Sequence, residues 1–379
     1  MRRVLLASML AALPAAAQAQ SSEFGIRGLG LPGRALSARA MGTAGGFALF
    51  DGESSVSPAS LAYLPALTAE FTGMSDYRTS ESPAGSASIR NFRFPQFLVG
   101  GPIKGLPLSA SFSYSNYTTR DFSLAFASTV TLNGVPVGVI DTLESRGGVN
   151  DLRLAVAYRA SNRIAIGVAG HVITGTNRVS LRRDFADTLY RPALQRAELS
   201  FAGFGMSIGV LAQPSRNLAV SLLARSDGHA SVERDSTEVD RIDLPVTLGG
   251  GLRWRALSKV DVAGHVLWRN WSTASTDLTD LGGVGAVNTL EAAAGLEFIR
   301  NVRRPSRLPL RVGFRYAKLP FPVAAGGEPK EYGVSVGTGF SFAADRGILS
   351  VALERTWRSE DPGFSERAWI LTTGVSVRP

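Results

Sequence analysis

Apolar and polar residues alternate along most of this chain with a period of two. In residues 259–271 the even positions are mainly valine and tryptophan, while the odd positions include Asp261, His265 and Arg269. Residues 306–318 and 347–358 repeat the pattern. Successive side chains of a β-strand point to opposite faces, whereas a helix would scatter these apolar residues around its axis. The alternation therefore predicts strands.

About fourteen such segments follow one another, each of about 12–17 residues. A tilted strand needs only about 9–11 residues to cross a bilayer, so each segment is long enough to do so. The predicted strands cover residues 66–77, 88–99, 105–118, 147–160, 163–177, 197–213, 217–228, 243–256, 259–272, 287–300, 306–318, 331–344, 347–358 and 366–377.

The connections between these segments alternate in length. Residues 119–146 and 178–196 make long connections, whereas 161–162 and 345–346 make very short ones. Outer-membrane barrels have long external loops and short periplasmic turns, and an even number of strands returns both ends to the periplasm. We therefore expect the long connections to be external loops and the short ones to be periplasmic turns.

The main alternative is a soluble β-sandwich, whose outer face would be polar. Here the apolar face of each strand continues to both ends and carries aromatic residues there, such as Trp268 and Trp357. The opposite face carries charges of both signs, including Glu291, Arg311 and Arg315, which a dry core could not hold. The sequence thus predicts an all-β protein: a transmembrane antiparallel β-barrel with a polar interior.

Composition narrows the possible chemistry. The chain is 45% hydrophobic and 19% charged, with no Cys and three His. The lack of Cys excludes disulfides, thiolate metal sites and thiol catalysis, and three His offer little for a metal. We therefore expect no catalytic site, no metal and no cofactor. The net charge of +9 does not indicate nucleic-acid binding, because the arginines are scattered and the chain carries an export signal.

The first nineteen residues have the order of a signal peptide: Arg2 and Arg3, an apolar core, then Ala17-Gln18-Ala19. We predict a signal peptide at 1–19, an N-terminal segment at 20–65 and a barrel at 66–379, placed in a bacterial outer membrane. Expected partners are outer-membrane lipid and lipopolysaccharide, whose phosphates suit arginine, and the barrel assembly machinery. We expect a monomer.

Residues 20–65 are rich in Gly and Ala and do not alternate. One reading is a flexible periplasmic tail. However, the segment resembles the N-terminal hatch of the long-chain fatty acid transporter (FadL/TodX-like) family, although Ser57 stands where the family commonly has Asn. The resemblance implies a fourteen-stranded barrel plugged by this hatch, from which hydrophobic substrates leave sideways into the membrane. It rests on Gly28, Gly30, Arg34, Gly42, Asp51, Ser57, Pro58 and Ala59.

Two features depart from the family pattern. The connection 178–196 is charged, where family members have apolar external helices that capture substrate. The chain also ends in Arg378-Pro379, without the terminal aromatic residue that assists barrel assembly.

A passive channel for a hydrophobic ligand needs an apolar patch in its polar lumen. The candidates are Phe47, Phe50 and Leu61, together with Phe97, which we expect to point inward; plug–wall packing is the alternative role for these residues. Pro95 lies within a predicted strand, where it removes a ladder hydrogen bond, and we therefore expect it to interrupt the wall.

Two other functions are compatible with this barrel. The first is a non-transporting barrel that anchors or shuttles exported proteins through its long external loops. The second is a lipid-modifying enzyme using His171 or His265, which we disfavour because the chain has no G-x-S-x-G nucleophile motif.

Overall fold

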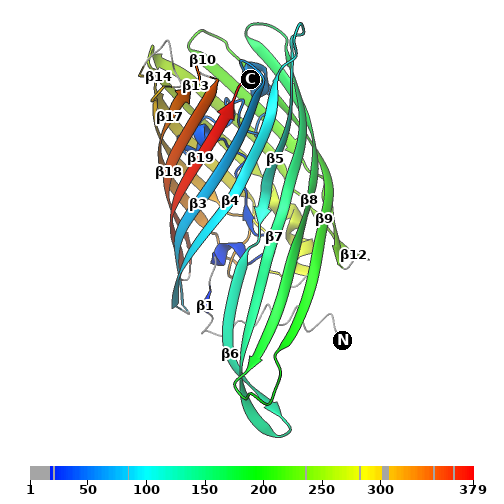
Figure 1. Ribbon diagram of the computed structural model, residues 1–379. Helices are drawn as coiled ribbons and strands as arrows, with labels where there is room; N and C mark the ends of the chain where they lie inside the picture. Colours follow the sequence, from blue (N-terminus) through cyan, green and yellow to red (C-terminus); the bar gives the residue numbers. More distant parts are fainter. Residues whose placement is uncertain are drawn as a thin grey trace.

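Neighbouring strands pair antiparallel around the whole barrel, and the last strand, β19 (Phe364–Val377), pairs with β3 (Thr68–Ser82) and closes the sheet (Figure 1). The computed structural model describes residues 18–19, 22–83, 85–234, 237–280, 283–300, 307–344, 346–361 and 363–379. Fourteen strand positions surround the barrel, as predicted. Two of these positions are each shared by two strands: one by β10 (Leu218–Ser226) and β11 (His229–Arg234), the other by β12 (Thr237–Asp243) and β13 (Val246–Leu257).

The barrel strands are β3 (Thr68–Ser82), β4 (Gly85–Pro102), β5 (Leu108–Thr119), β7 (Val135–Arg159), β8 (Ile164–Phe185), β9 (Ala193–Ala212), β10 (Leu218–Ser226), β11 (His229–Arg234), β12 (Thr237–Asp243), β13 (Val246–Leu257), β14 (Val260–Arg269), β15 (Thr289–Phe298), β16 (Leu310–Lys318), β17 (Lys330–Phe342), β18 (Gly347–Glu360) and β19 (Phe364–Val377). Three further short strands are β1 (Gln18–Ala19), β2 (Leu31–Pro32) and β6 (Phe122–Leu132). The helical pieces are η1 (Glu23–Gly25), α2 (Ala38–Met41), η2 (Ala59–Tyr63), η3 (Trp271–Ala274) and α3 (Ser275–Asp280). Among the described residues, no helix is long and apolar enough to cross a bilayer.

The two longest predicted loops are largely strand, so that part of the prediction is wrong. Residues 119–146 hold β6 and the first half of β7, and residues 178–196 continue β8 and begin β9. These four strands extend beyond the rest of the barrel (Figure 1). Asn133 and Gly134, with φ of 51° and 80°, make the turn between β6 and β7. An Asn-Gly pair is the usual sequence signal for such a turn, and it was available in the sequence.

The two faces of the strands differ as the alternation predicts. On the outer face Val312, Leu353 and Trp369 are exposed, whereas the inward Glu297, Arg311 and Glu354 are buried. A lipid-facing apolar surface and a charged interior are the reverse of a soluble sandwich.

Phe97 does not point inward, and that prediction is wrong. Its register partner on β3 is Phe71, which is 44% exposed on the outer face, while Gln96 and Leu98 on either side of Phe97 are buried inside. The reason is a β-bulge at Phe94 and Pro95, which shifts the register of β4 by one residue and reverses the face of each side chain beyond it.

Residues 22–65, called the N-terminal segment below, run through the interior of the barrel before joining β3 (blue in Figure 1). Most of their side chains are buried although little of the segment is regular structure. Ser37 caps α2 by accepting a hydrogen bond from the Ala40 amide at 3.1 Å. Apart from Gln18 and Ala19, the predicted signal peptide lies outside the described residues.

Candidate functional site

Small residues let the backbone of the N-terminal segment lie directly against the wall. A Cβ atom on Gly167 of β8 would stand 2.3 Å from the Pro58 carbonyl carbon, and one on Gly313 of β16 would stand 2.1 Å from that of Thr43. These distances are far below ordinary contact, so only glycine fits at either place. The predicted Ser57-Pro58-Ala59 turn is one of these contacts. Gly42 makes another, since a Cβ on it would meet Gly337 at 3.2 Å.

Three ion pairs tie the N-terminal segment to distant strands. Arg34 donates to both carboxylate oxygens of Glu354 at 2.8 Å. Arg39 pairs with Glu297 at 2.7 Å, and this carboxylate raises the pKa of the Arg39 guanidinium above its usual range. Just after the end of β19, Arg378 donates to Glu53 at 2.8 Å. The segment is therefore anchored through charge as well as through close packing.

Asp51 organises the segment from within. Its carboxylate accepts hydrogen bonds from the hydroxyls of Ser37, at 2.6 Å, and Ser54, at 2.8 Å. Gln96 of β4 donates to the Glu53 carbonyl oxygen at 2.7 Å and so links this loop to the wall. The predicted motif residue Asp51 thus holds the segment's own fold.

Phe47, Phe50 and Leu61 are all buried where the segment packs on the wall. Phe47 and Phe50 share a cluster with Leu211 and Leu267, whereas Leu61 belongs to a separate cluster. Their contacts are those of close packing, and a role in ligand binding stays a prediction for them. Phe97 does not join them.

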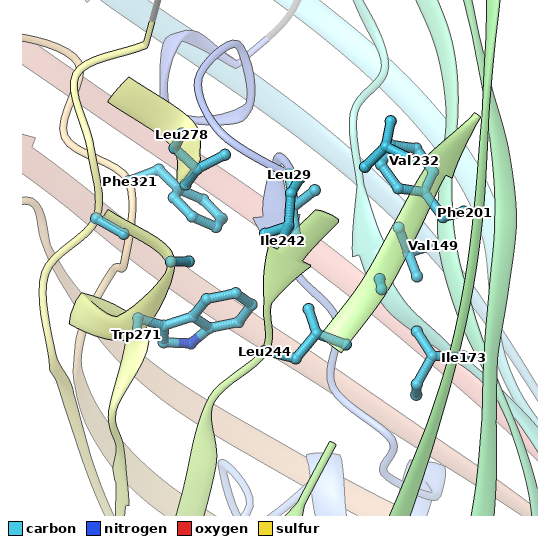
Figure 2. Packing of buried hydrophobic residues seen from close by; sticks show 13 residues of the cluster. Leu29, Val149, Ile173, Phe201, Val232, Ile242, Leu244, Trp271, Leu278 and Phe321 are labelled. Carbon is cyan, nitrogen blue, oxygen red and sulfur yellow. The ribbon is translucent and has the colours of Figure 1, made fainter. Parts of the chain in front are cut away.

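A larger apolar cluster, which the alternation of the sequence does not predict, lies elsewhere in the interior (Figure 2). Its centre is aromatic: Trp271 of η3 meets Phe321 edge-on at 5.1 Å between ring centroids and lies 6.1 Å from Tyr117 of β5. Leu29 joins it from the N-terminal segment, and Gly28, with φ of 52°, lets that chain pass beside the Phe321 ring. In the sequence, Trp271 lies at the end of the predicted strand 259–272 and Phe321 lies in the connection 319–330, so alternation gives no sign that the two rings meet. Its buried members are Leu29, Val149, Ile173, Phe201, Ala230, Val232, Ile242, Leu244, Trp271, Ala274, Leu278, Ala286 and Phe321.

The wall itself is interrupted beside this cluster. β4 pairs with β5 only from Gln96 to Pro102, and within the described residues no pairing joins β5 to residues 85–95 of β4. Pairing stops at the residue that follows Pro95, whose ring removes the amide donor. We call the unpaired stretch, residues 85–95 facing 116–119, the wall break.

The N-terminal segment occupies the edge of β5 that β4 leaves free. β2 pairs there, with Leu31 opposite Thr119, and the Gly33 amide donates to the Tyr117 carbonyl at 2.8 Å. A Cβ on Gly30 would lie 2.2 Å from the Thr119 carbonyl oxygen, so this close pairing requires glycine. The segment thus substitutes for β4 along the wall break.

Aromatic residues also lie on the outer side of the wall break. Phe94 stands 4.9 Å from both Phe71 and Phe92, and Phe92 is 64% exposed on the lipid-facing surface. The wall break therefore separates an aromatic cluster inside the barrel from another one outside it.

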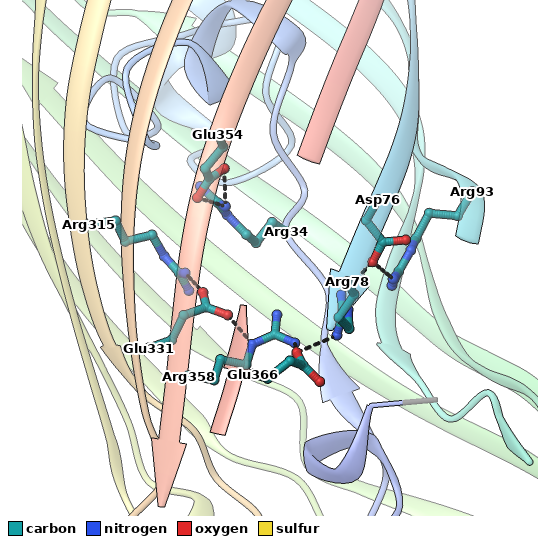
Figure 3. Close-up of polar contacts among 9 residues, drawn as sticks. All are labelled: Arg34, Asp76, Arg78, Arg93, Arg315, Glu331, Glu354, Arg358 and Glu366. Atoms are coloured by element: carbon teal, nitrogen blue, oxygen red, sulfur yellow. Dashed lines mark hydrogen bonds and ion pairs between the residues drawn. The ribbon is translucent and has the colours of Figure 1, made fainter. Parts of the chain in front are cut away.

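A chain of ion pairs crosses the inner wall toward the wall break (Figure 3). Each carboxylate in it is shared by two arginines, for example Glu366 between Arg358 at 2.6 Å and Arg78 at 2.8 Å. We call this set the ion-pair chain. In order from β14 to β4 its members are Arg269, Glu291, Arg315, Glu331, Arg358, Glu366, Arg78, Asp76 and Arg93.

On the far side of the barrel His171 links three strands. Its Nδ1 lies 2.9 Å from the Asp151 carboxylate and its Nε2 lies 2.8 Å from the Ser207 hydroxyl. Both ring nitrogens are thereby engaged, and Arg225 donates to the same Asp151 at 2.8 Å. All these side chains are largely buried, and the arrangement holds β7, β8, β9 and β10 together. In the described part of the chain, no cluster of His, Asp and Glu could hold a metal ion.

Several solved structures share this fold. A Pseudomonas aeruginosa FadL homologue has 11% sequence identity and a TM-score of 0.64, over 91% of this chain and 99% of that one. The P. putida toluene transporter TodX has 15% identity and a TM-score of 0.58, over 90% and 98%. The Ralstonia pickettii toluene transporter TbuX has 12% identity and a TM-score of 0.55, over 91% and 98%.

No family model and no curated relative matches the chain. The structural likeness extends over nearly the whole of both chains in each comparison, and it matches the fold that the N-terminal residues led us to expect. The chain has a FadL/TodX-like barrel fold.

Proposed function

We propose that this chain is an outer-membrane channel for the passive uptake of hydrophobic small molecules, such as long-chain fatty acids or similar apolar compounds. In this proposal the N-terminal segment is a plug, and cargo leaves sideways through the wall break into the membrane. The observation that carries the proposal is the interruption of the β4–β5 wall with aromatic residues on both of its sides.

The aromatic cluster is the proposed binding region. Tyr117, Trp271 and Phe321 form a packed apolar cluster within a charged interior, and apolar and aromatic side chains are what usually line binding sites for hydrophobic ligands. Leu29 belongs to this cluster and Leu31 to the pairing at the wall break. A ligand that displaces Leu29 would therefore pull on the part of the plug that covers the exit.

The likeness to toluene transporters supports the same function, and it gives no support to the alternative of a barrel that anchors exported proteins. Outer-membrane location follows from the proposed function and from the apolar outer face of the strands.

A reversible lock tests the proposal. Because the chain has no Cys, Leu31→Cys and Thr119→Cys would place the only two thiols opposite each other across the β2–β5 pairing. Oxidation should stop uptake of radiolabelled oleate or toluene by cells, and a reductant should restore it.

The matched control is a Val99→Cys/Phe112→Cys pair, which bridges the paired part of the same wall. Oxidation of this control should leave uptake unchanged. If the protein oxidised at Leu31→Cys/Thr119→Cys takes up both compounds as fast as the reduced protein, the sideways exit is not the route.

A further inference from the structure

One side chain crosses the wall break directly. Arg93 lies on the unpaired part of β4, and its Nη1 donates to the Thr119 hydroxyl on β5 at 3.1 Å. Its Nη2 donates to Asp76 on β3 at 3.2 Å. A single guanidinium thereby joins β3, β4 and β5 where the backbone ladder between β4 and β5 is missing.

The carboxylate that holds Arg93 is itself fixed. Asp76 pairs with Arg78 at 2.5 Å, and Arg78 continues the ion-pair chain through Glu366 to β18 and beyond (Figure 3). The ion-pair chain contains five arginines and four carboxylates, so its ends are held less tightly than its middle. Arg93 is such an end: its side chain is 23% exposed, compared with 4% for Arg78.

We propose that Arg93 is a latch that keeps the wall break closed, and that cargo release requires its guanidinium to leave Thr119 while it stays paired with Asp76. This inference rests on the proposed sideways exit and assigns its control to one residue. The fixed Asp76 is the pivot, and the hydrogen bond to Thr119 is the part that opens.

The geometry explains why a latch of this kind suits an apolar cargo. The Arg93 guanidinium spans the wall break as a charged group, and an apolar molecule that passes there would have to contact this charge, which opposes passage. Rotation of the Arg93 side chain removes this barrier without breaking any backbone hydrogen bond of β4. The pairing of β2 with Thr118 and Thr119 must still separate, and the Arg93 bond to Thr119 holds the same residue in place.

Two substitutions of Thr119 isolate the latch. Thr119→Val keeps the shape of the side chain but removes the acceptor, and Thr119→Ser keeps the acceptor. We expect Thr119→Val to raise the rate of N-phenylnaphthylamine uptake by intact cells about two- to tenfold, the effect of losing one hydrogen bond. Thr119→Ser should keep the wild-type rate. Arg93→Lys retains a positive charge for Asp76 but cannot bond Asp76 and Thr119 at once as the two guanidinium nitrogens do, so it should behave like Thr119→Val.

The control is Arg90→Ala, because Arg90 lies on the same strand but its guanidinium stacks over the Tyr77 ring at 5.4 Å on the outer face. A heat-dependent change in migration on a denaturing gel shows that the barrel of each variant has assembled. If cells with Thr119→Val and cells with Thr119→Ser take up the probe at equal rates, Arg93 is not a latch, although the proposed uptake function would still stand.

A second measurement does not depend on transport. Exchange of the backbone amides of residues 30, 31, 33 and 116–119 should be faster in Thr119→Val than in Thr119→Ser, because the latch holds Thr119, which pairs with Leu31 of β2. If wild-type cells take up no N-phenylnaphthylamine, the proposed function is wrong, and the hydrogen-exchange measurement alone tests whether Arg93 is a latch. Identical exchange in the two variants refutes it.

Discussion

The close approach of Pro58 to the barrel wall leads to a sharp prediction for Gly167→Ala. The new Cβ would stand 2.3 Å from the Pro58 carbonyl carbon and 2.5 Å from the Ala59 nitrogen, about 1.1 Å inside the 3.4 Å at which ordinary contact begins. β8 cannot yield, since it is paired on both sides, with Ala157 of β7 and Gly209 of β9. The N-terminal segment must therefore move.

Overpacking of this kind costs about 1–3 kcal/mol. The cost falls on the contact between the N-terminal segment and the wall, so the barrel should assemble while the segment is held less tightly. We expect urea titrations in micelles to show that the free energy of unfolding falls by up to this amount. Liposomes that contain Gly167→Ala should leak small polar solutes faster than liposomes that contain the wild-type protein.

Gly170→Ala is the matched control on the same strand. Gly170 points outward with open space around it, so the same substitution should change stability by less than about 0.5 kcal/mol and leave leakage unchanged. If both variants behave alike, or if Gly167→Ala is indistinguishable from wild type in stability and leakage, the turn at Pro58 does not press on the wall.

Three further predictions test the barrel as a whole. Deletion of residues 22–60 should leave an assembled, heat-modifiable barrel that leaks small polar solutes in swelling assays; a sealed barrel would mean that the segment is only a tail. Val312→Arg should cost about 2–4 kcal/mol in folding titrations, because Val312 faces lipid and pairs with Val336 in the middle of β17, and a neutral result would contradict this orientation. An epitope tag between Asn133 and Gly134 should bind antibody on intact cells, whereas a tag between Ser161 and Asn162 should not; the opposite result would invert the topology.

The number and faces of the strands follow from the sequence because alternation is a local property. Each residue of a lipid-spanning strand must be apolar or polar according to its own face, so Val312 and Arg311 reveal their orientation without knowledge of any partner. The same rule failed at Phe97, because a bulge at Pro95 changes the period by one residue and its effect on the register depends on β3.

The candidate site depended on contacts between residues far apart in the chain. Arg34 meets Glu354 across 320 positions and Arg78 meets Glu366 across 288, and no local pattern pairs them. The small residues of the N-terminal segment showed that it could pack closely, but only the closed barrel decides that β2 lies along β5 and that Arg93 reaches Thr119. In a closed barrel every strand has a neighbour on each side, so a strand edge stays unpaired only where pairing with one neighbour is broken. Here the pairing of β4 with β5 ends next to Pro95, which can be read from the sequence. Only the tertiary structure shows that β2 pairs with the edge of β5 that β4 leaves free.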